Sequence, residues 1–184
     1  MADTLGYPPG PNSFAVLHKM SNYEKRGRND AAINLGKRWT EAQPGDGFND
    51  NIFIGIAWLF LKKAQHDSPQ ADDYVHQALL YRDRALDVAS DTSGIYSIEA
   101  LRDLAFISTV AGDLSPKRRC RQYENAIKLL ERRAAMLKEK QEEISRRFVP
   151  DKNDFTLEDV KCLSDENQAA IAQVRERQQS YACR

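Results

Sequence analysis

Two short phrases with the same pattern, Ser68-Pro69 and Ser115-Pro116, each open a long amphipathic segment of this chain. Serine is a favoured helix N-cap, and proline suits the first helical position because its missing N–H is not needed there. Each segment carries a small residue, Ala78 or Ala126, ten or eleven positions after its serine. A pattern repeated in this way predicts helical hairpins stacked in sequence order.

Apolar residues recur at helical spacing along most of the chain, which predicts an all-α fold. The first helix is expected from Ser13 to a stop at Gly27, and Asn29 or Asp30 can cap a second helix that ends at Pro44-Gly45. The other helices are expected to begin near Asp50, at Pro69, before Ile98, at Pro116 and after Thr156. Residues 1–12, rich in proline and glycine, are predicted to be a mobile N-terminal arm.

The helix predicted over residues 116–148 is unusually long, and its apolar residues alternate at spacings of four and three. Such spacing is typical of a coiled-coil seam, so another helix must lie against it. Residues 149–184 supply a matching apolar stripe behind a predicted capping box at Thr156 and Asp159. We therefore expect a repeat domain over 13–148 and a C-terminal helical cap over 149–184. The alternative is a seam shared between two subunits.

Residues 13–46 resemble a tetratricopeptide repeat at its packing positions, which are Val16, Met20, Tyr23, Gly27, Ala32, Trp39 and Pro44. Looser versions of the pattern extend to about residue 137, with Gly55, Ala78, Ala105 and Ala126 as small residues at close helix contacts. The resemblance implies a right-handed superhelical stack of about three hairpins with a C-terminal capping helix or helix pair. It also implies a concave groove for a peptide or partner helix, and no catalysis. The clamp that some members use for C-terminal carboxylates is missing, because the matching positions hold Leu17, Ser21, Glu99 and Asp103.

Composition adds few constraints, since 27 basic residues balance 27 acidic ones. Three cysteines, Cys120, Cys162 and Cys183, form no paired motif and favour a reducing cytoplasm. The longest apolar run, residues 52–61, is too short to cross a membrane. His66 and His76 match no metal-ligand spacing, and no motif for a cofactor or a catalytic nucleophile is recognisable.

Charge is distributed unevenly, because residues 41–113 hold twelve acids against five bases while 116–147 hold eleven bases against five acids. The basic residues are densest at Lys117, Arg118, Arg119 and Arg121. This basic cluster can bind nucleic-acid phosphates or an acidic protein surface, or it can simply be a solvated helix start.

Tyr74, Tyr81 and Arg82 form a second candidate contact surface on a long helix, with packing against the neighbouring helix as the alternative. The sequence thus predicts a non-catalytic adaptor that binds another protein, as a monomer or homodimer. The alternatives are a nucleic-acid-associated regulator that uses residues 117–121 and a self-assembling structural subunit.

Overall fold

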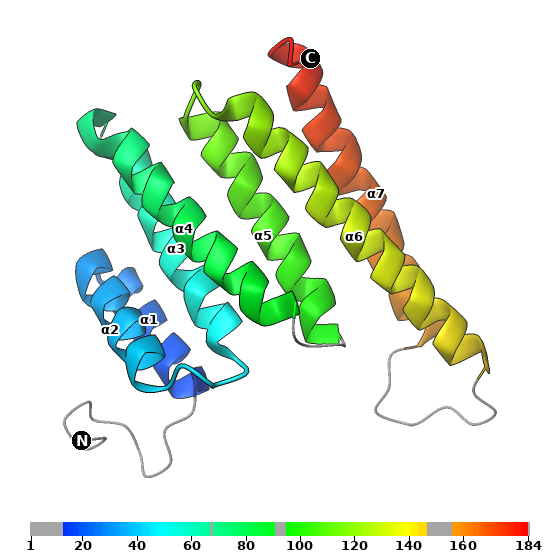
Figure 1. Ribbon diagram of the computed structural model, residues 1–184, viewed down its shortest axis with the longest axis horizontal. Helices are drawn as coiled ribbons and strands as arrows, with labels where there is room; N and C mark the ends of the chain where they lie inside the picture. The colour runs from blue at the N-terminus through cyan, green and yellow to red at the C-terminus, as the bar shows by residue number, and fades with distance from the viewer. Residues whose placement is uncertain (1–12, 67, 91–94, 147–155, 184) are drawn as a thin grey trace. The chain divides into compact units, whose positions relative to one another are not determined.

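The computed structural model describes residues 13–66, 68–90, 95–146 and 156–183 of the 184-residue chain. The predicted arm over 1–12 lies outside these ranges. Within them the α-helices are α1 (Ser13–Lys25), α2 (Asn29–Ala42), α3 (Asn49–His66), α4 (Ala71–Ser90), α5 (Ile95–Leu114), α6 (Arg119–Arg146) and α7 (Leu157–Ser180) (Figure 1). The described residues contain no β-strand, so the predicted all-α fold class is confirmed.

The chain divides into two compact units, Met1–Ser93 and Gly94–Arg184. The first unit contains α1 to α4 and the second contains α5 to α7. The sequence had grouped residues 13–148 into a single repeat domain, whereas this division falls between the second and third predicted hairpins. Each unit has buried apolar side chains of its own, such as Ile52 in the first and Leu137 in the second.

In the first unit α3 is the central helix, because it packs against α1, α2 and α4. Its nearly continuous apolar sequence explains this position, since Ile52, Ile56 and Leu61 are fully buried. Gly36 of α2 makes the tightest approach, where an added Cβ would come within 2.9 Å of the Ile56 side chain. The absence of a side chain at Gly36 therefore lets α2 and α3 approach closely. The sequence predicted small residues at helix contacts, although it did not single out this one.

The small residues named from the sequence differ in what they do. Ala78, Ala105 and Ala126 are buried, which confirms that they lie at helix contacts. Gly55 of α3 is less constrained, because a Cβ there would lie 3.4 Å from the Met20 methyl group, an ordinary van der Waals distance. Gly55 therefore also lies at a helix contact, between α3 and α1, although this contact leaves room for a Cβ.

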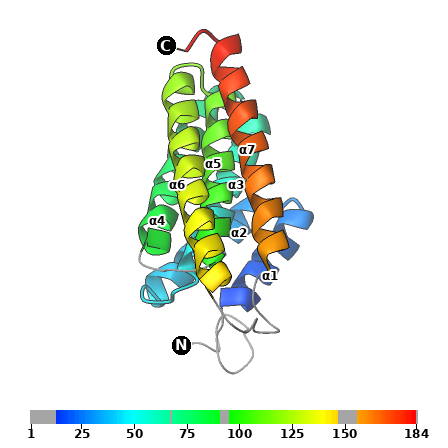
Figure 2. The ribbon, with the colours of Figure 1, turned by 90° about the vertical axis from the view of Figure 1, so that its right-hand side faces the viewer.

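In the second unit α6 contacts both α5 and α7, and α7 runs beside α6 (Figure 2). The apolar stripe of α7 is buried at Val160, Ile171 and Val174. Near the start of α7, Val160 packs with Ile98 of α5 and Leu137 of α6. The described part of the α6 seam is thus covered by a helix of the same chain.

Helix starts were predicted less well than helix positions. Residues 68–70 form a 3₁₀ turn, so α4 begins at Ala71, and α6 begins at Arg119 rather than at Pro116. The cap residue of α2 is Arg28, without a side-chain capping bond, so the cap predicted at Asn29 or Asp30 is wrong. Asp30 instead pairs with Lys63 of α3 at 2.6 Å.

The start of α7 follows the sequence. The Thr156 hydroxyl accepts a hydrogen bond from the Asp159 backbone N–H, and the Asp159 carboxylate accepts one from the Thr156 backbone N–H, which confirms the predicted capping box.

None of the helices in the described ranges combines the length and apolar character that a bilayer crossing requires.

Candidate functional site

The aromatic residues predicted as a contact surface on α4 pack within the first unit. Tyr81 is buried, and its ring stacks on that of Phe60 with 5.9 Å between the centroids. The Tyr74 ring also stacks on Phe60, with 6.3 Å between the centroids. Arg82 is buried too, and its guanidinium pairs with the adjacent Asp83. Packing against the neighbouring helix is thus the arrangement observed for the two tyrosines.

The basic cluster at the start of α6 is divided between two environments. Arg119 turns back toward α5, where its Nε donates to the Gly112 carbonyl at 3.2 Å. Its guanidinium also lies 3.8 Å from the centre of the Tyr181 ring. Three members of the cluster remain exposed, Lys117, Arg118 and Arg121. Arg119 therefore serves the structure of the second unit, and only its three neighbours face solvent.

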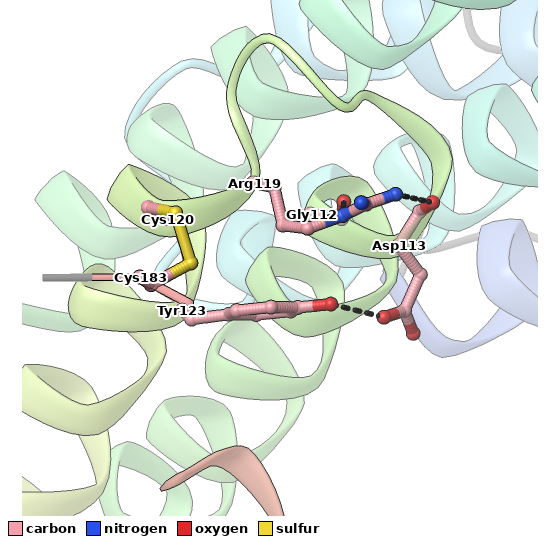
Figure 3. Close-up of a disulfide and its surroundings, with 6 residues drawn as sticks. All are labelled: Gly112, Asp113, Arg119, Cys120, Tyr123 and Cys183. Carbon is pink, nitrogen blue, oxygen red and sulfur yellow. Dashed lines mark hydrogen bonds between the residues drawn. A yellow bond between two sulfur atoms is a disulfide. The ribbon is translucent and has the colours of Figure 1, made fainter. Parts of the chain in front are cut away.

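A disulfide between Cys120 and Cys183 ties the first turn of α6 to the chain just beyond α7 (Figure 3). The third cysteine, Cys162, is free and exposed. No paired motif in the sequence pointed to this bond, because the two cysteines are 63 residues apart and only the antiparallel packing of α6 and α7 brings them together. We call the surrounding group the C-terminal clasp, defined by Asp113, Arg119, Cys120, Tyr123, Tyr181 and Cys183.

Tyr123 joins the clasp to α5. Its side chain is fully buried, and its hydroxyl donates to a carboxylate oxygen of Asp113 at 2.6 Å (Figure 3). Burial, and then the hydrogen bond to that carboxylate, raise the pKa of the Tyr123 phenol above its ordinary value. The neutral phenol is therefore a structural donor at physiological pH.

Arg133, near the middle of α6, links α7 to the first turn of α5. Its fully buried guanidinium donates to the Ile98 carbonyl at 3.2 Å and to Asn167 Oδ1 at 3.4 Å. The Asn167 amide in turn donates to the Leu130 carbonyl of α6 at 2.9 Å. The third guanidinium nitrogen, Nη2, lies 3.2 Å from a Glu99 carboxylate oxygen and 3.5 Å from one of Glu166. Since these bonds require one relative placement of the helices, they fix the register of α7 on α6.

The sequence analysis did not identify Arg133 or Asn167, although a signal was present. Arg133 lies between Leu130 and Leu137 at helical spacing, and Asn167 lies four residues before Ile171 on the apolar stripe of α7. A polar residue interrupting each of two apolar stripes that must face one another indicates a buried polar pair.

Between these two fastenings α5, α6 and α7 border a groove of about 440 Å³. Its apolar surface comes mainly from alanine and branched side chains around one large ring, namely Ala105, Phe106, Leu130, Ala169, Ala170 and Val174. The Phe106 side chain is 55% exposed although it lies in the middle of α5. We call this feature the α5–α7 groove.

Charged pairs stand at both ends of the α5–α7 groove. Arg102 lies 4.0 Å from Glu166 at one end, and Arg177 lies 3.7 Å from Asp113 at the other. Both pairs bridge α5 and α7, and Asp113 also belongs to the C-terminal clasp. The groove therefore has an apolar centre and ends of mixed charge.

The described residues contain no group of three or more histidine, cysteine, aspartate or glutamate side chains placed to hold a metal ion. Comparison with known proteins adds no relative: neither a family model, nor a curated protein, nor a solved structure matches this chain.

Proposed function

We propose that the chain is a non-catalytic protein-interaction module of the tetratricopeptide-like kind, and that its α5–α7 groove binds a peptide segment or helix of a partner protein. The main support for this proposal is Phe106, a large apolar residue that is 55% exposed and lines the groove together with several alanines. Exposed apolar surface that is concave and bordered by polar groups is typical of binding sites rather than of ordinary protein surface.

The length of the groove suits a short segment. Its lining on α7 runs from Glu166 to Arg177, which corresponds to roughly 16 Å along the helix axis. That length matches about three turns of a bound helix or about five residues of an extended peptide. Ala169 and Ala170 leave room for a side chain of the partner beside the Phe106 ring.

The contacts that attach α7 to α5 and α6 beside the groove also favour binding. Arg133 and the C-terminal clasp hold α7 in place before any partner arrives. A preformed groove binds more tightly than one that must be ordered on binding, because less conformational entropy is lost.

Support for the repeat class comes from the hairpin order of the helices and from the buried alanines at their contacts. α1 with α2, α3 with α4 and α5 with α6 are consecutive packed pairs, and α3 contacts both helices of the preceding pair. In such an arrangement α5 and α7 take the place of the first helices of successive hairpins, which line the groove in the repeat family.

The proposal is tested with peptides of about 12 residues selected from a display library on the full, disulfide-intact chain. We expect the selected peptides to carry an apolar anchor and to lose at least about tenfold in affinity against Phe106→Glu. Phe14→Glu is the matched control, because Phe14 is 60% exposed on the other unit. Peptides that bind both variants as well as the native chain would refute the groove as the binding site.

The cytoplasmic location expected from the sequence also stays a proposal, and the disulfide gives it a direct test. Cytosolic thiols are usually kept reduced, so a cytoplasmic protein should present all three cysteines to an alkylating reagent applied at cell lysis. Alkylation of Cys162 alone would place the protein in an oxidising compartment.

A further inference from the structure

The C-terminal end of α7 has little buried surface to attach it to the second unit. Val174 is the last buried residue of this helix, and none of the described residues after it, 175–183, is buried. The Tyr181 ring lies 6.2 Å from that of Tyr123 between centroids, but Tyr181 is 50% exposed. Hydrophobic burial, which attaches the earlier turns of α7, therefore contributes little at this end.

Two ion pairs also reach the end of α7. Arg175 lies 3.5 Å from Glu131 of α6, and Arg177 lies 3.7 Å from Asp113 of α5. All four side chains are at least one third exposed, so solvent screening leaves each pair only a small contribution to stability. The disulfide of the C-terminal clasp is therefore the strongest attachment of residues 175–183.

The turn that follows α7 is a Schellman motif with an unfavourable residue. The Cys183 N–H donates to the Gln178 carbonyl at 2.9 Å. The Ala182 N–H donates to the Gln179 carbonyl at 3.0 Å, and Ala182 has a φ of +52°. Glycine is usual at this position, because a Cβ disfavours the left-handed conformation. The turn therefore has a conformational cost, and the covalent bond from Cys183 to α6 keeps it in place despite that cost.

The disulfide is accessible to a reductant. Cys120 is exposed and Cys183 is half-buried. Exposed disulfides are reduced more readily than buried ones, and they are often regulatory. The free Cys162 lies near the start of α7, at the opposite end of that helix, so it is too far away to exchange with this bond within the molecule.

We propose that the C-terminal clasp is a redox switch for the α5–α7 groove. The disulfide keeps residues 175–183 against α5 and α6, and its reduction by a small thiol or dithiol releases them. This inference rests on the proposed binding of a peptide at Phe106. Arg177 lines the groove and closes one end of it by pairing with Asp113. The oxidised chain therefore binds its partner more tightly than the reduced chain, in which this end of the groove must be ordered on binding.

The chemistry of the switch is thiol–disulfide exchange. A thiolate of the reductant attacks one sulfur of the Cys120–Cys183 bond, and the bonding electron pair leaves on the other sulfur, which takes up a proton. A second thiolate of the reductant then attacks the mixed disulfide and releases the second cysteine, which is protonated in turn. The protein gains two electrons and two protons, and the reductant is oxidised to its disulfide.

Release of the segment is tested by NMR relaxation of the full chain before and after treatment with dithiothreitol. Backbone order parameters of residues 178–183 are expected to fall below about 0.6 on reduction, while those of residues 160–174 stay near about 0.85. Unchanged order parameters at 178–183 would overturn the proposal. Loss of order throughout 160–174 would also overturn it, because the bond would then be needed for the fold itself.

Control of the groove is tested with a library-selected peptide that loses affinity for Phe106→Glu. Its affinity for the native chain should fall about fivefold on reduction and recover when oxidised glutathione restores the bond. The Cys120→Ser/Cys183→Ser variant should have the lower affinity with or without dithiothreitol, and Cys162→Ser should respond as the native chain does.

Equal affinities of the oxidised and reduced native chains would overturn control of the groove, as would a response of the double variant to dithiothreitol. A peptide that tolerates Phe106→Glu marks a different failure, that of the proposed function. The order parameters of residues 178–183 do not depend on any peptide, so they still decide whether reduction releases the end of α7.

Discussion

Gly112 lies at a close contact of α5 with α6, and its lack of a side chain has a measurable consequence. A Cβ at this position would come within 2.9 Å of the Tyr123 ring and 3.2 Å of the Arg119 carbonyl. Neither neighbour can easily yield, because the ring is buried and hydrogen-bonded and the carbonyl is backbone. Replacing Gly112 by alanine should cost about 1–3 kcal/mol of stability through this clash. That cost should exceed the gain in helix propensity, which is at most about 1 kcal/mol.

We therefore predict that Gly112→Ala lowers the free energy of unfolding of the second unit by about 1–2 kcal/mol in a denaturant titration. Gly55→Ala is the control, since a Cβ there meets the Met20 methyl group only at 3.4 Å. That variant should be neutral or more stable by up to about 1 kcal/mol. A Gly112→Ala protein as stable as Gly55→Ala would contradict the close approach of α5 and α6.

Tyr123 makes the second unit sensitive to alkaline pH. The folded state raises the pKa of its phenol above the ordinary 10.0, through burial and the hydrogen bond to Asp113. The neutral form is favoured on folding, so this contribution to stability is fully present below about pH 10 and is lost as the pH rises toward the folded-state pKa. Unfolding free energies at pH 8, 10 and 11 should fall more steeply for the native chain than for Tyr123→Phe. Parallel curves for the two proteins would contradict this role.

At the scale of the element, the attachment of α7 depends on Arg133. Its two carboxylate partners are half-exposed, so those ion pairs contribute little after solvent screening. Most of its effect should come from packing and from the buried bonds to the Ile98 carbonyl and to Asn167.

Replacing Arg133 by alanine removes both contributions, and we predict a loss of about 2–4 kcal/mol in the unfolding free energy of the second unit. Arg133→Met should lose less, because it restores most of the buried volume. Arg132→Ala, at the exposed neighbouring position, should change stability by less than about 0.5 kcal/mol. Equal stabilities for the alanine variants at 132 and 133, measured by denaturant unfolding, would show that Arg133 does not hold α7.

The helices were predictable from the sequence because their signals are local. The stop at Gly27 and the capping box at Thr156 each depend on residues within one turn of the helix end. The cap of α2 was mispredicted because Asp30 pairs with Lys63, a residue more than thirty positions away. The same limit applies to Phe106, whose neighbours in sequence do not indicate that its ring is exposed. Arg133 differs, because its place between Leu130 and Leu137 on an apolar stripe was a signal in the sequence.

At the scale of the whole molecule, the Cys120–Cys183 disulfide should stabilise one unit and leave the other unaffected. Closing a loop of 63 residues restricts the unfolded chain by about 4 kcal/mol, and measured effects of disulfides are commonly about 2–4 kcal/mol. We predict that Cys120→Ser/Cys183→Ser loses about that amount and that amide exchange speeds up in α5 to α7 but not in α1 to α4.

Cys162→Ser is the matched control for that double variant, because Cys162 is free and exposed. It should leave both stability and amide exchange unchanged. Faster exchange in α1 to α4 of the double variant would show that the two units do not stabilise themselves independently.

Binding of a protein segment around Phe106 in the α5–α7 groove is the proposal on which the function of the chain depends. The most direct measurement is the dissociation constant of a library-selected peptide for the native chain, for Phe106→Glu and for Phe14→Glu. We expect a loss in affinity of at least about tenfold for Phe106→Glu and a change within about twofold for Phe14→Glu. Unchanged binding to Phe106→Glu, or an equal loss in the two variants, would contradict it.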